Sequence, residues 1–139
     1  MKKIVLNKYN IIIAFLMSLF GFASCEKAPN AMYGVPSATF KVIGTVTNES
    51  NLPIEGIRVI LNSDTTLTDA SGNYLVGVTE FPGDKSLNVT FKDIDGASNG
   101  SYIQKDSTVN FVDNEYQNGS GWNSGEVSKT VDIKLKEEL

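Results

Sequence analysis

The chain has no histidine and only one cysteine, Cys25, among its 139 residues. Without histidine, a serine or cysteine nucleophile has no imidazole base beside it, so Ser-His and Cys-His catalysis are excluded. A lone thiol cannot form a disulfide within the chain, and the ligand sets of ordinary zinc sites are missing as well. The folded part must therefore gain its stability from packing.

The sequence also has only one long apolar run, residues 11–23. The run is shorter than the roughly 20 apolar residues that a membrane-spanning helix needs. Lysines precede it, and small residues follow it directly before Cys25. This order of basic, apolar and small residues is typical of a secretory signal.

Ala23, Ser24 and Cys25 resemble the end of a lipobox, although Phe22 stands where that pattern prefers leucine. We therefore expect residues 1–24 to be a lipoprotein signal and Cys25 to be the lipidated first residue of the mature protein. We expect acyl chains such as palmitate to anchor the protein in a membrane, which is its expected partner. One acyl chain binds a bilayer only reversibly, whereas several together anchor a protein stably. The alternative is an ordinary signal peptide cut near Ser24, which would leave a free thiol.

Positive charge is scarce after residue 24. Nine basic side chains face sixteen acidic ones there, a net charge of −7. Nucleic-acid binding demands a basic surface, so we expect no nucleic-acid partner. The same negative charge disfavours direct binding to anionic lipid, so attachment to the membrane must come from the acyl chains.

The mature chain divides into two parts. Residues 25–37 carry two prolines and no periodicity, which predicts the lipidated cysteine and a tether. Residues 38–139 show apolar residues at every second position, the mark of half-buried strands, separated by turn signals. We therefore predict an all-β fold, a single antiparallel β-sandwich of about seven strands. The predicted strands cover residues 40–46, 57–61, 74–78, 87–91, 109–111 and 131–135, with an edge segment at 65–68.

Two segments carry a resemblance to a known fold family. Residues 44–59 read Gly-Thr-Val-Thr followed by a loop with Pro53 and Gly56, and residues 66–74 contain Thr-Asp-Ala-Ser-Gly-Asn-Tyr. They resemble the carboxypeptidase regulatory-like, transthyretin-like sandwich. The resemblance implies a non-catalytic module. The residues Asp-Ala-Ser-Gly at 69–72 themselves predict a type I turn closed by a glycine with positive φ.

A second resemblance covers the whole chain. Residues 32–36, Met-Tyr-Gly-Val-Pro, and residues 93–100 look like the lipoproteins associated with radical SAM enzymes in Bacteroidetes. This family implies the anchor and the fold but no reaction. We expect an envelope lipoprotein that acts as a non-catalytic binding or structural module; the alternative is a substrate or accessory of a companion radical SAM maturation system.

Asp93, Asp95 and Asn99 place oxygen atoms at positions one, three and seven of a loop, as calcium sites do. The loop departs from the EF-hand pattern, because Gln104 stands at the twelfth position where glutamate is required. The alternative, which we favour, is a polar loop in which these side chains cap turns by accepting hydrogen bonds from backbone N–H groups, and we expect no cofactor.

Residues 112–126 combine glycines with Tyr116 and the only tryptophan, Trp122. Exposed aromatic residues in a loop can stack on sugars or anchor a protein, so this segment is a candidate binding loop for a protein or glycan partner. The alternative is that Trp122 folds back over the open end of the sandwich.

Two further expectations concern modification and location. Thr65 and Ser107 follow aspartate in Asp-Thr-Thr and Asp-Ser-Thr, which resemble O-glycosylation sites of Bacteroidetes. The acids that Bacteroidetes surface-export signals place after the lysine near the cysteine are missing after Lys27, which disfavours surface display. Glu26 is not the aspartate associated with inner-membrane retention in enteric bacteria, so we expect an outer-membrane lipoprotein with the periplasmic or the surface side left open. Nothing in the sequence selects a catalytic carboxylate pair, and we expect no enzymatic activity.

Overall fold

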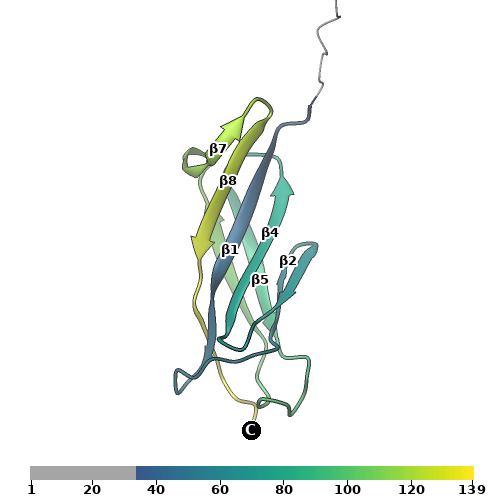
Figure 1. The fold of residues 1–139 in the computed structure, drawn as a ribbon, viewed down its shortest axis with the longest axis vertical. Helices are drawn as coiled ribbons and strands as arrows, with labels where there is room; N and C mark the ends of the chain where they lie inside the picture. Colours follow the sequence, from purple (N-terminus) through teal and green to yellow (C-terminus); the bar gives the residue numbers. More distant parts are fainter. Residues whose placement is uncertain (1–33) are drawn as a thin grey trace, which may run out of the picture. The chain divides into compact units, whose positions relative to one another are not determined.

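The structure is a computed structural model and describes residues 34–139; the signal-like run and Cys25 lie outside the described residues. Gly34–Leu139 forms one compact unit (Figure 1). No helix in this part of the chain is long and apolar enough to span a bilayer. The elements are β1 Ser37–Asn48, β2 Arg58–Leu61, β3 Asp64–Leu67, β4 Asn73–Glu80, β5 Lys85–Lys92, β6 Lys105–Phe111, η1 Asp113–Glu115, β7 Gln117–Ser120, β8 Asn123–Thr130 and β9 Ile133–Leu135.

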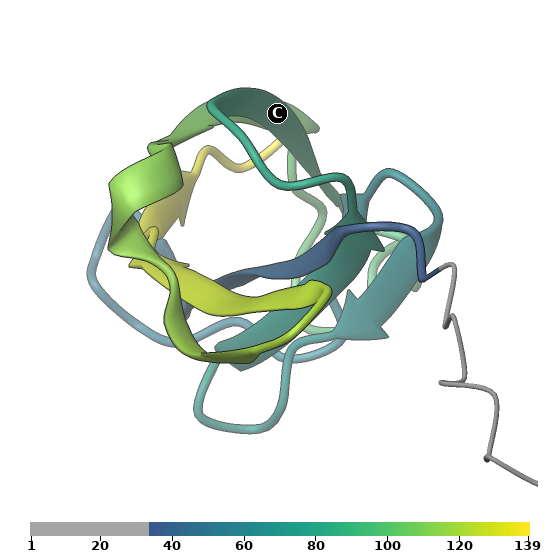
Figure 2. The same cartoon turned by 90° about the horizontal axis from the view of Figure 1, so that it is seen from above.

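The strands form two sheets that face each other around the core (Figure 2). One sheet has the order β4-β1-β8-β7, with β9 paired to the far end of β1. The other has the order β3-β2-β5-β6 and is antiparallel throughout. Two pairings in the first sheet, β1 with β8 and β1 with β9, are parallel.

The long strand β1 organises the first sheet, because β4, β8 and β9 all pair with it. Buried and half-buried residues alternate along its first half. Phe40, Val42 and Val46 point inward and are fully buried. Aromatic rings then join the two layers edge to face: Phe40 packs on Phe111 of β6 with ring centres 5.2 Å apart, and Tyr74 packs on Phe91 of β5 at 5.4 Å. Such pairs stabilise a core beyond the area that they bury.

A buried hydroxyl connects the segments that precede and follow the β2–β3 hairpin. Thr68 Oγ1 donates to Ile54 O at 2.7 Å and accepts from Ile57 N at 2.9 Å. The turn that follows is the predicted one: Gly72 has φ +73°, and its N–H donates to Asp69 O at 2.8 Å. A side chain at residue 72 would lie 2.4 Å from Val46 O, so glycine is required there.

The predicted all-β sandwich is confirmed, and each of the seven predicted segments overlaps an observed strand. Nine strands form instead of about seven, because β7 lies within the segment predicted as a loop, residues 112–126, and β8 begins within it and continues to Thr130. The two parallel pairings were also not expected. Ser37, at the end of the predicted tether, is already the first residue of β1.

Candidate functional site

The edge of the first sheet is only partly covered. β7 pairs with β8 between Gln117 and Ser120, and its last partner along β8 is Glu126. Residues 127–130 of β8 pair with β1 on one side. On the other side they have no strand partner within residues 34–139, so this stretch is an open sheet edge.

The hydrogen bonds of β8 show which backbone groups lie on that edge. Val131 N donates to Ile43 O of β1 at 2.8 Å, so Val131 directs its N–H toward β1. Alternate residues of a strand direct their backbone groups to opposite sides. The N–H and C=O groups of Ser128 and Thr130 therefore point away from β1, and both residues are exposed.

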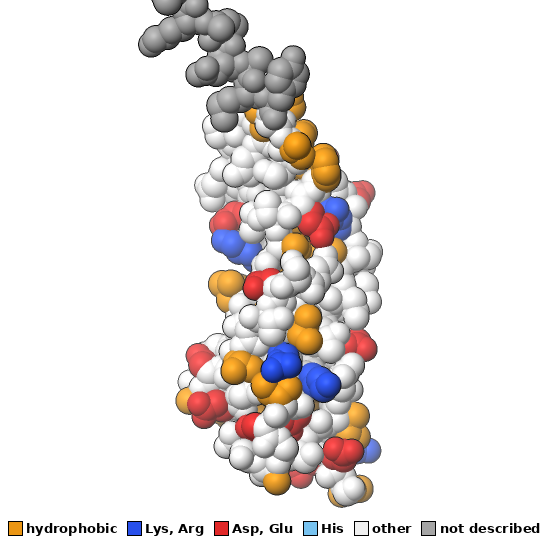
Figure 3. All heavy atoms as spheres, turned by 90° about the vertical axis from the view of Figure 1, so that its right-hand side faces the viewer, with side chains coloured by type: hydrophobic (Ala, Val, Ile, Leu, Met, Phe, Trp, Pro, Cys, Tyr) orange, Lys and Arg blue, Asp and Glu red, His pale blue; other side chains and the backbone are white. Residues whose placement is uncertain are grey.

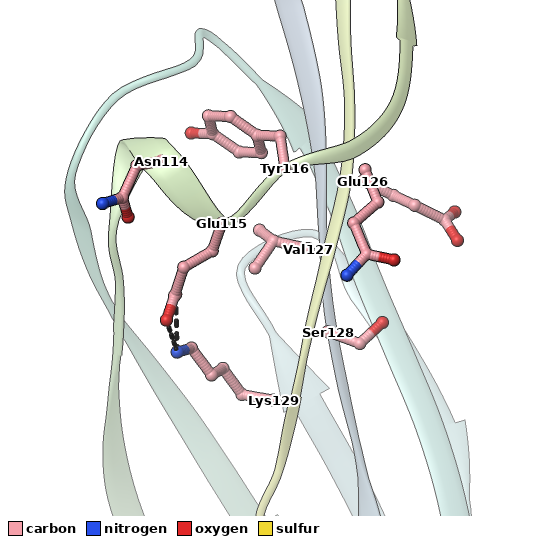
Figure 4. A pocket seen from close by; sticks show the side chains of 8 residues that line it. Asn114, Glu115, Tyr116, Glu126, Val127, Ser128 and Lys129 are labelled. Atoms are coloured by element: carbon pink, nitrogen blue, oxygen red, sulfur yellow. Dashed lines mark hydrogen bonds and ion pairs between the residues drawn. The ribbon is translucent and has the colours of Figure 1, made fainter.

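A groove of about 460 Å³ lies beside this edge (Figure 4). Its walls come from η1, the start of β7 and the uncovered part of β8. The lining residues are Asn114, Glu115, Tyr116, Gln117, Glu126, Val127, Ser128 and Lys129.

One ion pair crosses the groove. Lys129 Nζ lies 2.7 Å from Glu115 Oε1 and 2.6 Å from Oε2, and the close-up shows the two side chains meeting between η1 and β8 (Figure 4). The hydrogen bond from Lys129 lowers the pKa of Glu115, and the N–H of Val112 acts in the same direction. A second pair, Lys41 with Glu126, lies on the outer face of the same sheet.

Tyr116 is held in place by the fold. Its hydroxyl donates to Gly83 O at 3.0 Å and accepts from Gly83 N at 2.8 Å, while its ring packs edge to face on Phe40 with centres 5.8 Å apart. These contacts fix the segment between η1 and β7. Tyr116 therefore forms a wall of the groove through its ring but has its hydroxyl already occupied.

Trp122 lies in the turn between β7 and β8, and the predicted loop 112–126 is in fact a 3₁₀ turn followed by this hairpin. The carbonyl of Trp122 accepts the N–H of Ser37 at 2.9 Å, and its side chain borders Gly34. The side chain is still 54% exposed. Tyr116 thus lies directly before β7 and Trp122 directly before β8, so the two aromatic residues of the predicted loop are separated by the strand β7.

The predicted calcium ligands lie in one loop after β5 and bond to the loop itself. Asp93 Oδ2 accepts from Tyr102 N at 2.9 Å, and its Oδ1 accepts from Asp95 N at 3.1 Å. Asn99 Nδ2 reaches Asp95 Oδ2 at 3.4 Å. Desolvation raises the pKa of Asp95, and the neighbouring carboxyl of Asp93 raises it further. This is the turn-capping arrangement named as the alternative, and calcium binding stays a prediction.

The two predicted glycosylation residues lie on opposite edge strands of the second sheet. Thr65 is exposed on β3, and Ser107 is half-buried on β6. The structure brings neither residue near the groove. Cys25, the predicted lipidation residue, lies outside the described residues.

A second groove of about 540 Å³ lies at the opposite end of the domain, beside β9. Lys105 Nζ donates to the carbonyl of Lys134 there at 3.2 Å, and Lys136 and Glu49 also line it. Its charges come from flexible exposed side chains, whereas the β8 groove has fixed backbone groups along one wall.

The β8 groove therefore offers recognition of a peptide backbone. An open strand edge pairs with another extended chain, as added strands do in many complexes. The charged residues that line the groove are already paired, Glu115 with Lys129 and Glu126 with Lys41. Sequence reasoning missed this edge because β8 has few apolar residues and its pairing ends part-way along the strand.

Comparisons with known proteins were made by sequence and by structure. No protein-family model matches the chain, and no curated protein matches it. Among solved structures, the chain is similar to one described as the structure of the streptococcal ancillary pilin, with 16% identity and a TM-score of 0.41. The match covers 71% of this chain and 32% of that one, so this chain spans about a third of its length. This likeness carries no argument about function.

Proposed function

We propose that the protein is a lipid-anchored lipoprotein of the bacterial envelope whose sandwich binds an extended polypeptide along the open edge of β8, without catalysis. The open edge beside the Glu115–Lys129 groove is the observation on which the binding proposal rests. The anchor rests on the sequence that ends at Cys25.

The edge is suited to a strand because its unpaired groups are backbone groups. Main-chain hydrogen bonds supply affinity in strand addition, and the side chains beside the strand supply specificity. Native edge strands are usually shielded, and β7 shields only the first part of β8. An added chain would continue the line of β7 and pair with Ser128 and Thr130.

The binding proposal is tested by Ser128→Pro beside Ser128→Ala. Proline removes the outward N–H and is tolerated on an edge strand, whereas alanine removes only the side chain. Envelope proteins crosslinked to the anchored protein in cells are compared by mass spectrometry. A partner captured by the wild type and Ser128→Ala but lost with Ser128→Pro supports the edge; equal capture by both variants contradicts it.

The location follows from the anchor. We place the protein at the outer membrane, and protease added to intact cells distinguishes the two sides, because only a surface-exposed domain is cleaved. The intact mass of the native protein addresses the companion-enzyme alternative. An added mass that vanishes on deletion of a radical SAM enzyme would favour a maturation substrate over a binding module.

A further inference from the structure

One end of the described domain carries exposed apolar side chains. Trp122 lies there because its carbonyl bonds Ser37 N at the start of β1. Phe81 lies there because it follows Glu80, the partner of Ala38 in the β1–β4 ladder. Val35, two residues before β1, completes the group. Figure 3 shows hydrophobic side chains gathered at this upper end.

These three apolar side chains are exposed to solvent and do not belong to the core. Val35 is 64% exposed, Phe81 61% and Trp122 54%. Trp122 is also the only tryptophan of the protein. Tryptophan and other aromatic residues favour the membrane–water interface, because a ring can lie among the lipid headgroups while its polar edge stays wet.

The chain leading to this end points to its occupant. Only residues 26–33 separate Cys25 from the described domain, and eight residues reach at most about 30 Å when fully extended. If Cys25 carries the lipid, the anchored end of the domain is Val35, and the bilayer surface is always within this short reach. We propose that Val35, Phe81 and Trp122 dock on the lipid surface, so that the domain sits directly on the membrane; this inference rests on the lipid anchor of the proposed function.

Weak contacts are sufficient for this docking. A short linker makes the second contact intramolecular, at an effective concentration of about the millimolar range. Burial of one half-exposed aromatic side chain changes the partition by about tenfold. Docking of this end would also leave the open edge of β8, on the side of the sandwich, accessible to an extended chain.

The test uses the mature protein purified from membranes and reconstituted into neutral phosphatidylcholine vesicles. Half of the vesicles carry bromine on the acyl chains, which quenches only a tryptophan that lies at the lipid. We expect blue-shifted Trp122 emission and strong quenching in the brominated vesicles. Emission at the wavelength of a water-exposed tryptophan, without quenching by the brominated lipid, would overturn the docking.

A matched pair of variants separates docking from chance collisions. Phe81→Ser removes an apolar contact at the docking end and should lower the quenching of Trp122 several-fold. Leu52→Ser removes a side chain of equal exposure, 60%, in the loop after β1 at the opposite end, and should leave the quenching unchanged. Equal effects of the two variants would contradict the proposal.

The failure of the anchor and the failure of docking give different results. An intact mass with acyl chains and unquenched Trp122 leaves the anchor standing and refutes docking. A mass without acyl chains refutes the anchor, and the same chain is then added to preformed vesicles. If the brominated lipid quenches Trp122 of this unacylated chain, and Phe81→Ser reduces the quenching, docking of this end on the lipid is supported. If Trp122 is not quenched, docking is refuted.

Discussion

At the scale of single residues, a few polar groups hold the strands in register. The hydroxyl of Tyr74 donates to Val131 O at 2.6 Å, although Tyr74 is nearly fully buried. Asp132 Oδ1 accepts both the N–H and the hydroxyl of Thr45 at 2.9 Å. These bonds replace the ladder where β8 ends and β9 has not yet begun.

Tyr74→Phe is expected to lower the free energy of unfolding by about 1–2 kcal/mol, because the partly buried carbonyl of Val131 loses this hydrogen bond while the ring stays on Phe91. Urea denaturation measures the change, with the slope unaltered if the native fold is kept. A loss well below this range would mean that water replaces the hydroxyl.

The buried hydroxyl of Tyr74 also gives a prediction of how stability changes at alkaline pH. Burial raises the pKa of Tyr74, and the charge of Asp132 raises it further. The unfolded chain then loses this proton near pH 10, while the folded chain retains it, so stability should fall as the pH rises above 10. Tyr74→Phe should show a shallower fall over the same range; an identical slope in both proteins would contradict this role.

Asp69 predicts the opposite dependence in acid. Hydrogen bonds from the backbone of Asn73 and of Ser71 lower its pKa from 3.8. Its contribution to stability is complete above pH 3.8 and is lost as the pH falls through the lower folded value. Asp69→Asn keeps an acceptor oxygen in the turn, so it should flatten the acid side of the stability curve.

The control for Asp69 is Asp106→Asn. Asp106 is exposed on β6 and makes no side-chain hydrogen bond or ion pair within the described residues. Both variants remove one negative charge, so a flattening common to the two would indicate a net-charge effect. Chemical denaturation between neutral and acidic pH gives the comparison.

At the scale of elements, the break between β8 and β9 depends on Gly44. A side chain there would lie 2.1 Å from Val131 O, a backbone atom that cannot move aside. Gly44→Ala is therefore expected to cost about 3 kcal/mol or to abolish folding. Gly77→Ala in the neighbouring strand is the control, because its nearest atoms lie at 3.3 Å, and thermal melting should separate the two.

The loop of Asp93 and Asp95 gives a prediction about calcium. Desolvation and the carboxyl of Asp93 raise the pKa of Asp95, so Asp95→Asn should raise the melting temperature at neutral pH. Backbone N–H groups of Asp95 and Tyr102 already bond both carboxylate oxygens of Asp93. If the loop only caps turns in this way, calcium should not shift the wild-type melting temperature. A calcium-dependent rise that Asp95→Asn removes would instead establish a cation site.

Alternation of apolar and polar residues made most strands predictable. β5 alternates clearly, since Leu87, Val89 and Phe91 point inward, and its position followed from the sequence. β8 has a single aliphatic residue, Val127, and it is a strand because β1 pairs with it along its length. A strand whose partner is distant in the sequence, and which pairs with it in parallel, need not show a local sequence pattern. The position of β8 could therefore not be predicted from its own residues.

The candidate site was less predictable than the fold. The sequence directed attention to Tyr116 and Trp122; Tyr116 directly precedes the β7–β8 hairpin that limits the groove, and Trp122 lies in the turn of that hairpin. The open edge depends on where β7 begins, because Gln117 pairs with Glu126, and Tyr116 fixes this point by bonding Gly83 in a distant turn. Such a boundary is set by tertiary contacts, so only the structure could reveal it.

At the scale of the whole molecule, the proposals assign different surfaces to different tasks. The end with Val35 and Trp122 follows the predicted tether, and the open edge of β8 lies along the side of the sandwich. An anchored domain of this kind would present a peptide-binding edge close to a membrane. The lipid on Cys25 is the claim on which this arrangement depends.

The most direct measurement is acyl labelling of the protein in cells, with the wild type compared with Cys25→Ser. The account predicts that the wild type incorporates labelled palmitate and partitions with membranes, and that the variant carries no label on the protein. A wild type without label, or a variant that keeps both its label and its membrane partitioning, would contradict the account.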